Sequence, residues 1–232
     1  MSRTLVVGDL RFELRPSKRR KTLGITVDRD GHLYLAAPAN ATKEEIERVV
    51  RRRRFWVYTK LAEKEALFRT PVRKEFVAGE GFFYLGRSYR LRLAGADGSA
   101  KPLSLTNGRF LLSRGETRHG QQRFIRWYSE HALPRLSALV VKNQERFGVT
   151  ARRVLIRDVG NRWASCGRKD ALYFHWRVIL LPPRVIQYIV LHELVHLREA
   201  HHSPEFWRLL GRAMPDFAER KQWLAENGSR YY

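Results

Sequence analysis

The segment from Pro183 to Trp207 constrains the fold of this chain more than any other. No proline or glycine occurs between Arg184 and Arg198, and apolar residues recur there at the spacing of a helix face. The segment opens on a proline, which suits a first helical turn because it gives up no intrahelical hydrogen bond there. Ser203 and Pro204 then predict a second helix, as N-cap and first helical residue. The chain is therefore expected to break and change direction at residues 200–202.

Four of the chain's eight histidines lie in this segment: His192, His196, His201 and His202. Residues four apart on a helix stand one above the other, so His192 and His196 can offer two imidazoles to one metal ion. Glu193 is rotated off that axis, where its carboxylate can take a proton from water at the metal without being a ligand. The pattern predicts a zinc site that needs a third ligand and an open fourth position.

Three nearby residues are candidates for the third ligand: Glu199, His201 and His202. Glu199 lies only three residues after His196, so it is expected to be an acid on the helix surface. His202 lies ten residues after His192, the spacing of the third histidine in several His-Glu-x-x-His enzymes, and it closely precedes the second helix start. The sequence therefore favours His202 over His201.

The net charge of the chain does not identify its binding partner. The chain has 45 basic and 23 acidic residues, a net charge of +22 that suits either a solvated surface or attraction to nucleic acid and nucleotides. The single cysteine, Cys166, cannot form an internal disulfide or supply a cysteine-rich zinc site, so a metal must be bound by histidine and carboxylate. No apolar run is long enough for a membrane span or a signal peptide, and we expect a soluble, cytoplasmic protein without a membrane partner.

The rest of the chain predicts an α+β fold. Alternating apolar residues predict strands at residues 10–14, 23–27 and 33–35, with a hairpin turn near Asp28 to Gly31. Thr42 and Glu45 form a capping-box signature ahead of one helix that carries apolar residues from Ile46 to Leu61. Strands are again expected around Tyr89 to Leu93 and on both sides of the turn at Asn107-Gly108.

The polar, glycine-containing stretch at residues 113–120 is the predicted domain boundary. We expect a β-rich subdomain with one helix at residues 1–115, followed by a zincin-like catalytic domain at residues 116–232 that combines a small sheet with the His-Glu-x-x-His helix. The second domain should begin with a long helix over residues 121–147, ended by Gly148. Strands are then expected at residues 154–156 and 172–180.

The motifs around the predicted zinc site resemble those of a known family. HELVHLREAHHSPEFW, preceded by NRWASCGRKDALYFHWRVILLP, resembles the YgjP-like metal-dependent hydrolases, which are related to the SprT-like and WLM zinc peptidases. RPSKRRKTLGITVDRDGHLYLAAP and YLGRSYRLRL also match the general run of that family, so the resemblance covers most of the chain. It implies that His192, His196 and His202 are zinc ligands and that Glu193 is the general acid and base.

Two departures from the family pattern affect the expected site. Trp-Ala-Ser-Cys, ending at Cys166, stands where the family has Trp-Gly-Ser-Cys, and His175-Trp176-Arg177 stands where it usually has Asn-Trp-Arg. A strand just upstream of the zinc helix commonly lines the cleft in zincins, so His175 and Arg177 are expected to contact substrate. The competing interpretations are structural: His175 as a histidine on a sheet face, and Cys166 as a small buried residue rather than a nucleophile.

The sequence leads to a zinc metallopeptidase acting on a protein or peptide substrate. The same metal site could instead hydrolyse a nucleoside triphosphate to the monophosphate and pyrophosphate, although no glycine-rich phosphate loop is visible. A third hypothesis is a basic nucleic-acid-binding module with a structural zinc. Glu193 weighs against this third hypothesis, because a structural zinc site does not need it.

Overall fold

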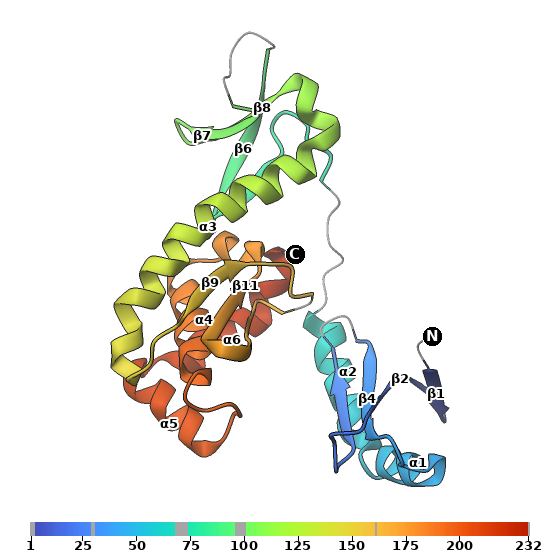
Figure 1. Cartoon of the computed structure of the whole chain (residues 1–232). Helices are drawn as coiled ribbons and strands as arrows, with labels where there is room; N and C mark the ends of the chain where they lie inside the picture. Colours follow the sequence, from blue (N-terminus) through green and yellow to red (C-terminus); the bar gives the residue numbers. More distant parts are fainter. Residues whose placement is uncertain (1–2, 29–30, 68–73, 96–100, 161, 232) are drawn as a thin grey trace. The chain divides into compact units, whose positions relative to one another are not determined.

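The computed structural model describes residues 3–28, 31–67, 74–95, 101–160 and 162–231 (Figure 1). The chain forms two compact units, Met1–Thr70 and Pro71–Tyr232, hereafter unit 1 and unit 2. Together they show the mixed α+β fold expected from the sequence. Both are basic: unit 1 has 17 basic and 9 acidic residues, and unit 2 has 28 and 14.

Unit 1 is a four-stranded sheet packed against two helices. Its elements are β1 (Arg3–Val7), β2 (Leu10–Ser17), β3 (Gly24–Val27), β4 (Leu33–Pro38), α1 (Lys43–Arg52) and α2 (Arg54–Leu67). The strand order is β1-β2-β4-β3, with β2 and β4 parallel and the other pairs antiparallel. The core joins Phe12 and Leu35 of the sheet to Ile46, Val50 and Val57 of the helices. This shared core fixes both helices on one face of the sheet.

The local predictions for unit 1 are confirmed except at one helix break. The hairpin between β3 and β4 forms, and the Asp28 N–H donates to the His32 carbonyl; residues 29 and 30 of the expected turn lie outside the described residues. Thr42 and Glu45 make the predicted capping box. The expected single helix from Ile46 to Leu61 is wrong, because Arg53 adopts φ −99° and ψ 8° and separates α1 from α2.

The first part of unit 2 is a second four-stranded sheet. Its strands are β5 (Gly81–Tyr84), β6 (Arg87–Ala94), β7 (Leu103–Thr106) and β8 (Arg109–Ser113), in the order β5-β6-β8-β7. The predicted hairpin turn at Asn107-Gly108 is confirmed, with φ of 49° and 70°, the left-handed values that a two-residue hairpin loop requires. Strands β6, β7 and β8 were therefore expected from the sequence, and β5 was not.

A long helix connects this sheet to the rest of unit 2. A short 3₁₀ segment, η1 (Arg114–His119), leads into α3 (Gly120–Gln144), and η2 (Glu145–Phe147) ends at Gly148 in the left-handed conformation, as predicted. Figure 1 shows α3 running from the β6–β8 region to the second sheet of the unit. On the first sheet's side, Phe124 of α3 stacks on Phe82 with ring centres 4.0 Å apart.

The structure divides the chain at residues 70–71, whereas the sequence predicted a boundary at residues 115–116, which falls inside unit 2 between β8 and η1. The reason is a core shared across that point, since Phe82 and Phe110 before it pack with Phe124 after it. Backbone bonds add to this: the N–H groups of Leu85 and Gly86 donate to the carbonyls of residues 179 and 180.

The second sheet of unit 2 is small. Its strands are β9 (Arg153–Ile156), β10 (Ala164–Cys166) and β11 (Ala171–Phe174), in the order β10-β11-β9, with a turn of 3₁₀ helix, η3 (Arg168–Asp170), before β11. The expected strand at 172–180 is too long: it stops at Phe174, and η4 (Trp176–Leu180) follows. The side chain of His175 caps η4 by accepting the Arg177 N–H at 3.1 Å, which ends the extended backbone. β10 was not expected from the sequence.

Three helices complete unit 2: α4 (Pro183–His196), α5 (Pro204–Ala213) and α6 (Phe217–Asn227), followed by η5 (Gly228–Tyr231). The helix starts at Pro183 and at Ser203-Pro204 are confirmed, and the Ser203 hydroxyl accepts the Phe206 N–H at 3.2 Å. In the described parts of the chain, no helix combines the length and hydropathy that crossing a bilayer requires.

Candidate metal centre

Helix α4 is packed into the core of unit 2 and carries the first two candidate ligands, which are partly buried. Apolar residues around its circumference are buried, including Ile189, Val190 and Leu191. Its last two turns present His192 and His196 toward one another, with ring centres 4.9 Å apart. A helix packed on several sides cannot rotate, so the directions of these two imidazoles are set by the core.

The turn after α4 brings the third histidine back over that helix. α4 ends at His196, with Leu197 as its C-cap. α5 begins at Pro204, and the Ser203 side chain is its N-cap. Between them, the Ser203 N–H donates to the His201 carbonyl at 2.8 Å. His202 is therefore held directly before a capped helix start. Its ring lies 4.9 Å from the ring of His192 and 4.7 Å from that of His196, centre to centre.

The three imidazoles form one candidate metal group. His192, His196 and His202 each offer a ring nitrogen, and these nitrogens lie within 4.8 Å of one another. The Nε2 atoms of His192 and His202 are 2.9 Å apart. In a tetrahedral zinc site with Zn–N bonds of about 2.0–2.1 Å, two ligand nitrogens stand roughly 3.3 Å apart. The site therefore accommodates zinc if the Nε2 atoms of His192 and His202 move slightly apart.

The orientation of the rings has both polar and aromatic causes. His196 Nδ1 lies 3.1 Å from the carbonyl oxygen of Glu199, a contact that leaves Nε2 directed to the group when Nδ1 carries the proton. The ring of Phe206 lies 4.9, 4.6 and 4.7 Å from those of His192, His196 and His202, respectively. Trp207 stacks on His202 at 5.4 Å. Phe206 and Trp207 pack against the imidazoles and limit their rotation.

Burial sets the charge of the histidines. In the metal-free protein, burial lowers the pKa of His192 to about 3, with the neighbouring histidines and Lys221 acting in the same direction. Partial burial also lowers the pKa values of His196 and of His202, which is the most exposed of the three. The imidazoles are therefore neutral at pH 7, and neutral nitrogens are the form that binds a metal ion.

Glu193 follows His192 on α4 and is buried, with 6% of its surface exposed. Burial raises the pKa of its carboxyl group to about 7, against the opposing effects of the Cys166 backbone N–H and the Arg162 cation. Its Oε2 atom is buried without a hydrogen-bond partner among the described residues. A carboxyl group whose pKa lies near neutrality can both accept and donate a proton at physiological pH.

The other sequence candidates occupy different positions. His201 is exposed, and neither it nor the Glu199 carboxylate is part of the three-histidine group in the described structure. Cys166 is partly buried, and burial raises the pKa of its thiol, which therefore stays protonated at pH 7. Its backbone, rather than its sulfur, assists the site by donating to Glu193.

His175 and Arg177 lie at the start of η4. His175 is buried, with 3% of its surface exposed, and its Nε2 is 3.7 Å from an Asp158 oxygen. The Arg177 guanidinium lies 4.8 Å from the centre of the Trp176 ring. These contacts give both residues a structural role in η4, and their contact with substrate stays a prediction.

Two further residues near the group were not identified from the sequence. Tyr188 lies one turn before His192 on α4, with ring centres 5.8 Å apart, and this four-residue spacing was a usable signal. Lys221 comes from α6 and lies over the Trp207 ring at 4.4 Å. Its ammonium group acts on both His192 and His202. No local pattern predicts this approach, because α6 reaches the site only through tertiary packing.

One family model matches most of the chain. The family model described as "YgjP-like, metallopeptidase domain" matches residues 21–227. No curated protein sequence matches the chain. Among solved structures, the metallopeptidase zymogen of Pyrococcus abyssi abylysin is similar, with 24% identity and a TM-score of 0.35; the match covers 38% of this chain and 89% of that one.

Proposed function

The chain belongs to the YgjP-like metallopeptidase family, and we propose that it is a zinc-dependent peptidase of zincin-like organisation. In this proposal His192, His196 and His202 bind the zinc, and Glu193 is the general acid and base. A protein or peptide is the substrate. His175 and Arg177 remain the proposed substrate contacts.

One observation carries the proposal: three imidazoles converge, and the residue after the first of them is a buried glutamate. The three ring nitrogens lie within 4.8 Å of one another, and Glu193 directly follows one of these histidines in the sequence. Structural zinc sites usually have four protein ligands, whereas catalytic sites keep one position for water or substrate. The described residues supply three ligands, which supports a catalytic site.

The residues of this chain have distinct tasks in peptide hydrolysis. Bound zinc would supply Lewis acidity and lower the pKa of water at the site. Glu193 takes a proton from the attacking water at a carboxylate oxygen and then gives it to the leaving amine. Its pKa of about 7 suits both transfers. Phe206 and Trp207 hold the imidazoles in place and exclude water from behind them.

A direct test compares two substrate classes on the same preparation. The zinc-loaded protein is incubated with an unfolded protein and, separately, with nucleoside triphosphates, each with and without a chelator. We expect chelator-sensitive cleavage of peptide bonds, detected by mass spectrometry. Pyrophosphate release without peptide cleavage would establish the competing hypothesis of a nucleoside triphosphate pyrophosphohydrolase. Zinc binding without either reaction would favour a structural zinc.

A further inference from the structure

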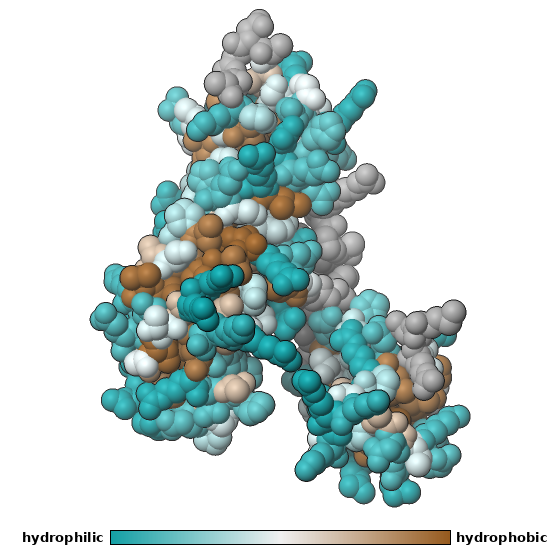
Figure 2. Space-filling model, viewed as in Figure 1, coloured by the Kyte–Doolittle hydropathy of each residue, from teal (hydrophilic) through white to brown (hydrophobic). Residues whose placement is uncertain are grey.

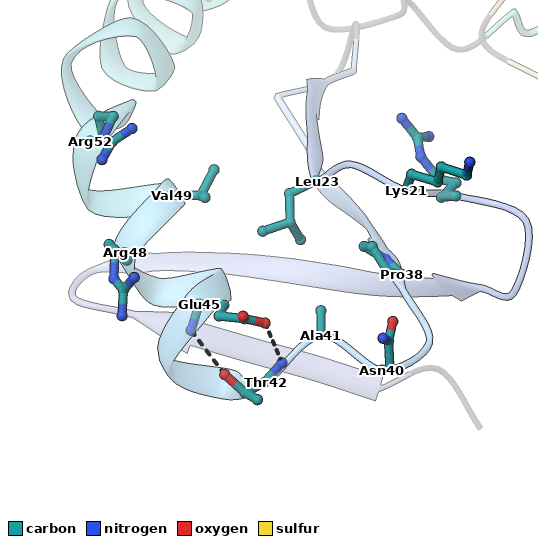
Figure 3. A pocket seen from close by; sticks show the side chains of 11 residues that line it. Lys21, Leu23, Pro38, Asn40, Ala41, Thr42, Glu45, Arg48, Val49 and Arg52 are labelled. Carbon is teal, nitrogen blue, oxygen red and sulfur yellow. Dashed lines mark hydrogen bonds between the residues drawn. The ribbon is translucent and has the colours of Figure 1, made fainter.

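Unit 1 contains a cavity of about 710 Å³ that is lined by basic residues (Figure 3). Its walls come from the connection between β2 and β3, the connection between β4 and α1, and one face of α1. Four cationic residues line it: Arg20, Lys21, Arg48 and Arg52. All four are exposed, so the cavity is open to solvent. It lies wholly within unit 1 and does not involve the histidine group.

Among the described residues, the cations of this cavity form no ion pairs, unlike two other cations of α1. Lys43 and Arg51 of α1 pair with Glu47, at 4.0 and 3.1 Å. In contrast, no ion pair joins any of the four lining cations to another residue in the described part of unit 1. Glu45 is the single acid in the lining, and its carboxylate accepts the Thr42 N–H in the capping box at 3.0 Å. The cavity therefore has excess positive charge.

The arrangement of the cations matches an extended anion. Arg48 and Arg52 lie one turn apart on α1, and Figure 3 shows Lys21 on the other side of the hollow. Leu23 and Val49 lie between these walls. Cations on two facing walls repel one another, and an anion placed between them relieves that repulsion. Several charges along one ligand would engage both walls at once.

We propose that this cavity binds the phosphodiester backbone of a single-stranded nucleic acid. Three of the four cations are arginines, whose planar guanidinium groups match phosphate oxygens in a two-point contact. The volume is in the range of sites for small-molecule ligands, roughly 300–1,000 Å³, which admits a short stretch of strand but not a duplex. Binding is driven by counterion release and falls steeply with salt.

The lining also argues against other ligands. No aromatic side chain is among the residues that line the cavity, so bases have no stacking surface and recognition is independent of sequence. Binding to a membrane would be favoured by large apolar side chains around the basic groups, and the lining offers only small or aliphatic ones. Figure 2 shows a largely hydrophilic surface on the visible face of unit 1, interrupted by smaller hydrophobic patches.

The test uses the full chain and a fluorescent oligothymidylate, with binding followed by anisotropy over a range of salt concentrations. The double variant Arg48→Gln with Arg52→Gln removes two charges from the cavity. The matched control, Arg11→Gln with Arg51→Gln, removes two exposed charges from unit 1 outside it. We expect about tenfold weaker binding for the cavity variant and a salt slope lower by about 1.4, or about 0.7 for each lost phosphate contact. The control should bind within about twofold of the original protein.

Three results would overturn this proposal: no binding of the oligonucleotide at low salt, equal losses in the two double variants, or stronger binding of polyglutamate or phosphatidylglycerol vesicles than of the oligonucleotide. A photo-cross-linking experiment on the unaltered chain gives an independent readout. Cross-links in peptides around Lys21 and Arg48 support the cavity, and cross-links confined to unit 2 contradict it. Peptide cleavage plays no part in these measurements, so this proposal can fail or hold independently of the peptidase proposal.

Discussion

The histidine group of unit 2 and the cationic cavity of unit 1 differ in how the fold controls charge. In the first, burial lowers the pKa of His192, so this imidazole is neutral before a metal binds, and burial raises the pKa of the Glu193 carboxyl group to about 7. In the second, the side chains of Arg48 and Arg52 are exposed. The histidine group therefore depends on desolvation and rigid packing, whereas the cationic cavity depends on uncompensated charge. The two sites should therefore respond differently to substitution, pH and salt.

The largest expected effect is loss of the metal on substitution of His202→Ala. Removing one of three ligands leaves two imidazoles of α4, so we expect zinc to be lost on dialysis and turnover to fall by at least about 100-fold. Metal content by mass spectrometry measures this directly. His201→Ala is the matched control, because it removes the adjacent, exposed histidine. Retention of zinc and activity in the His202 variant would show that another residue is the third ligand.

Substitution Glu193→Gln should separate metal binding from catalysis. The amide cannot carry the proton between water and the leaving amine, so kcat should fall by about 10²–10⁴-fold while zinc stays bound. Glu199→Gln serves as the control, since that carboxylate is outside the histidine group. Unchanged turnover in the Glu193 variant would contradict its role as general base.

The aromatic rings of Phe206 and Trp207, which pack against the histidines, should contribute strongly to stability. Phe206 is fully buried, and Phe206→Ala is expected to lower the free energy of unfolding by about 3–5 kcal/mol. Val141→Ala, an exposed apolar position on α3, is the comparison and should have a small effect. Chemical denaturation of the metal-free proteins provides the measurement. Similar losses in the two variants would mean that Phe206 does not anchor the site.

The contribution of Glu193 to the stability of the metal-free protein should fall as pH rises from 4.5 to 7. Its pKa is raised from about 4.5 when unfolded to about 7 when folded, so the stabilisation of the protonated form is complete below pH 4.5 and lost by pH 7. This amounts to an order of 3 kcal/mol. The lowered pKa of His192 acts in the opposite sense: stability falls as pH drops from 6.5 toward 3. In Glu193→Gln, denaturation curves between pH 4.5 and 7 should lack the Glu193-dependent loss; an unaltered pH profile would count against the raised pKa.

The smallest effect is expected in unit 1. Arg48→Gln with Arg52→Gln reduces repulsion between exposed charges, so the thermal midpoint of the full chain should rise slightly at low salt and not at high salt. Calorimetry at two ionic strengths tests this. The control pair, Arg11→Gln with Arg51→Gln, should not rise, because it also breaks the ion pair between Arg51 and Glu47. A rise that persists at high salt would point to a cause other than charge.

Local chemistry made part of this structure predictable. The helix starts at Pro183 and Ser203, the Thr42 capping box and the Asn107-Gly108 turn were all readable, because each depends on residues within four positions of one another. The spacing of His192 and His196 has the same origin. Together with the capped helix start after His202, it was enough to nominate the group that the structure brings together.

Packing between segments distant in sequence produced features that local patterns did not predict. The apolar alternation after Phe174 gave no sign that His175 would cap a 3₁₀ turn, and the polar stretch at residues 113–120 did not reveal a core that continues from Phe110 to Phe124. The approach of the Cys166 backbone to Glu193 and the facing walls of the cationic cavity also join segments distant in sequence. Short-range spacing predicted the starts of α4 and α5, the Thr42 capping box and the candidate ligands. Only packing over long separations determined which groups are desolvated and which charges lack a partner.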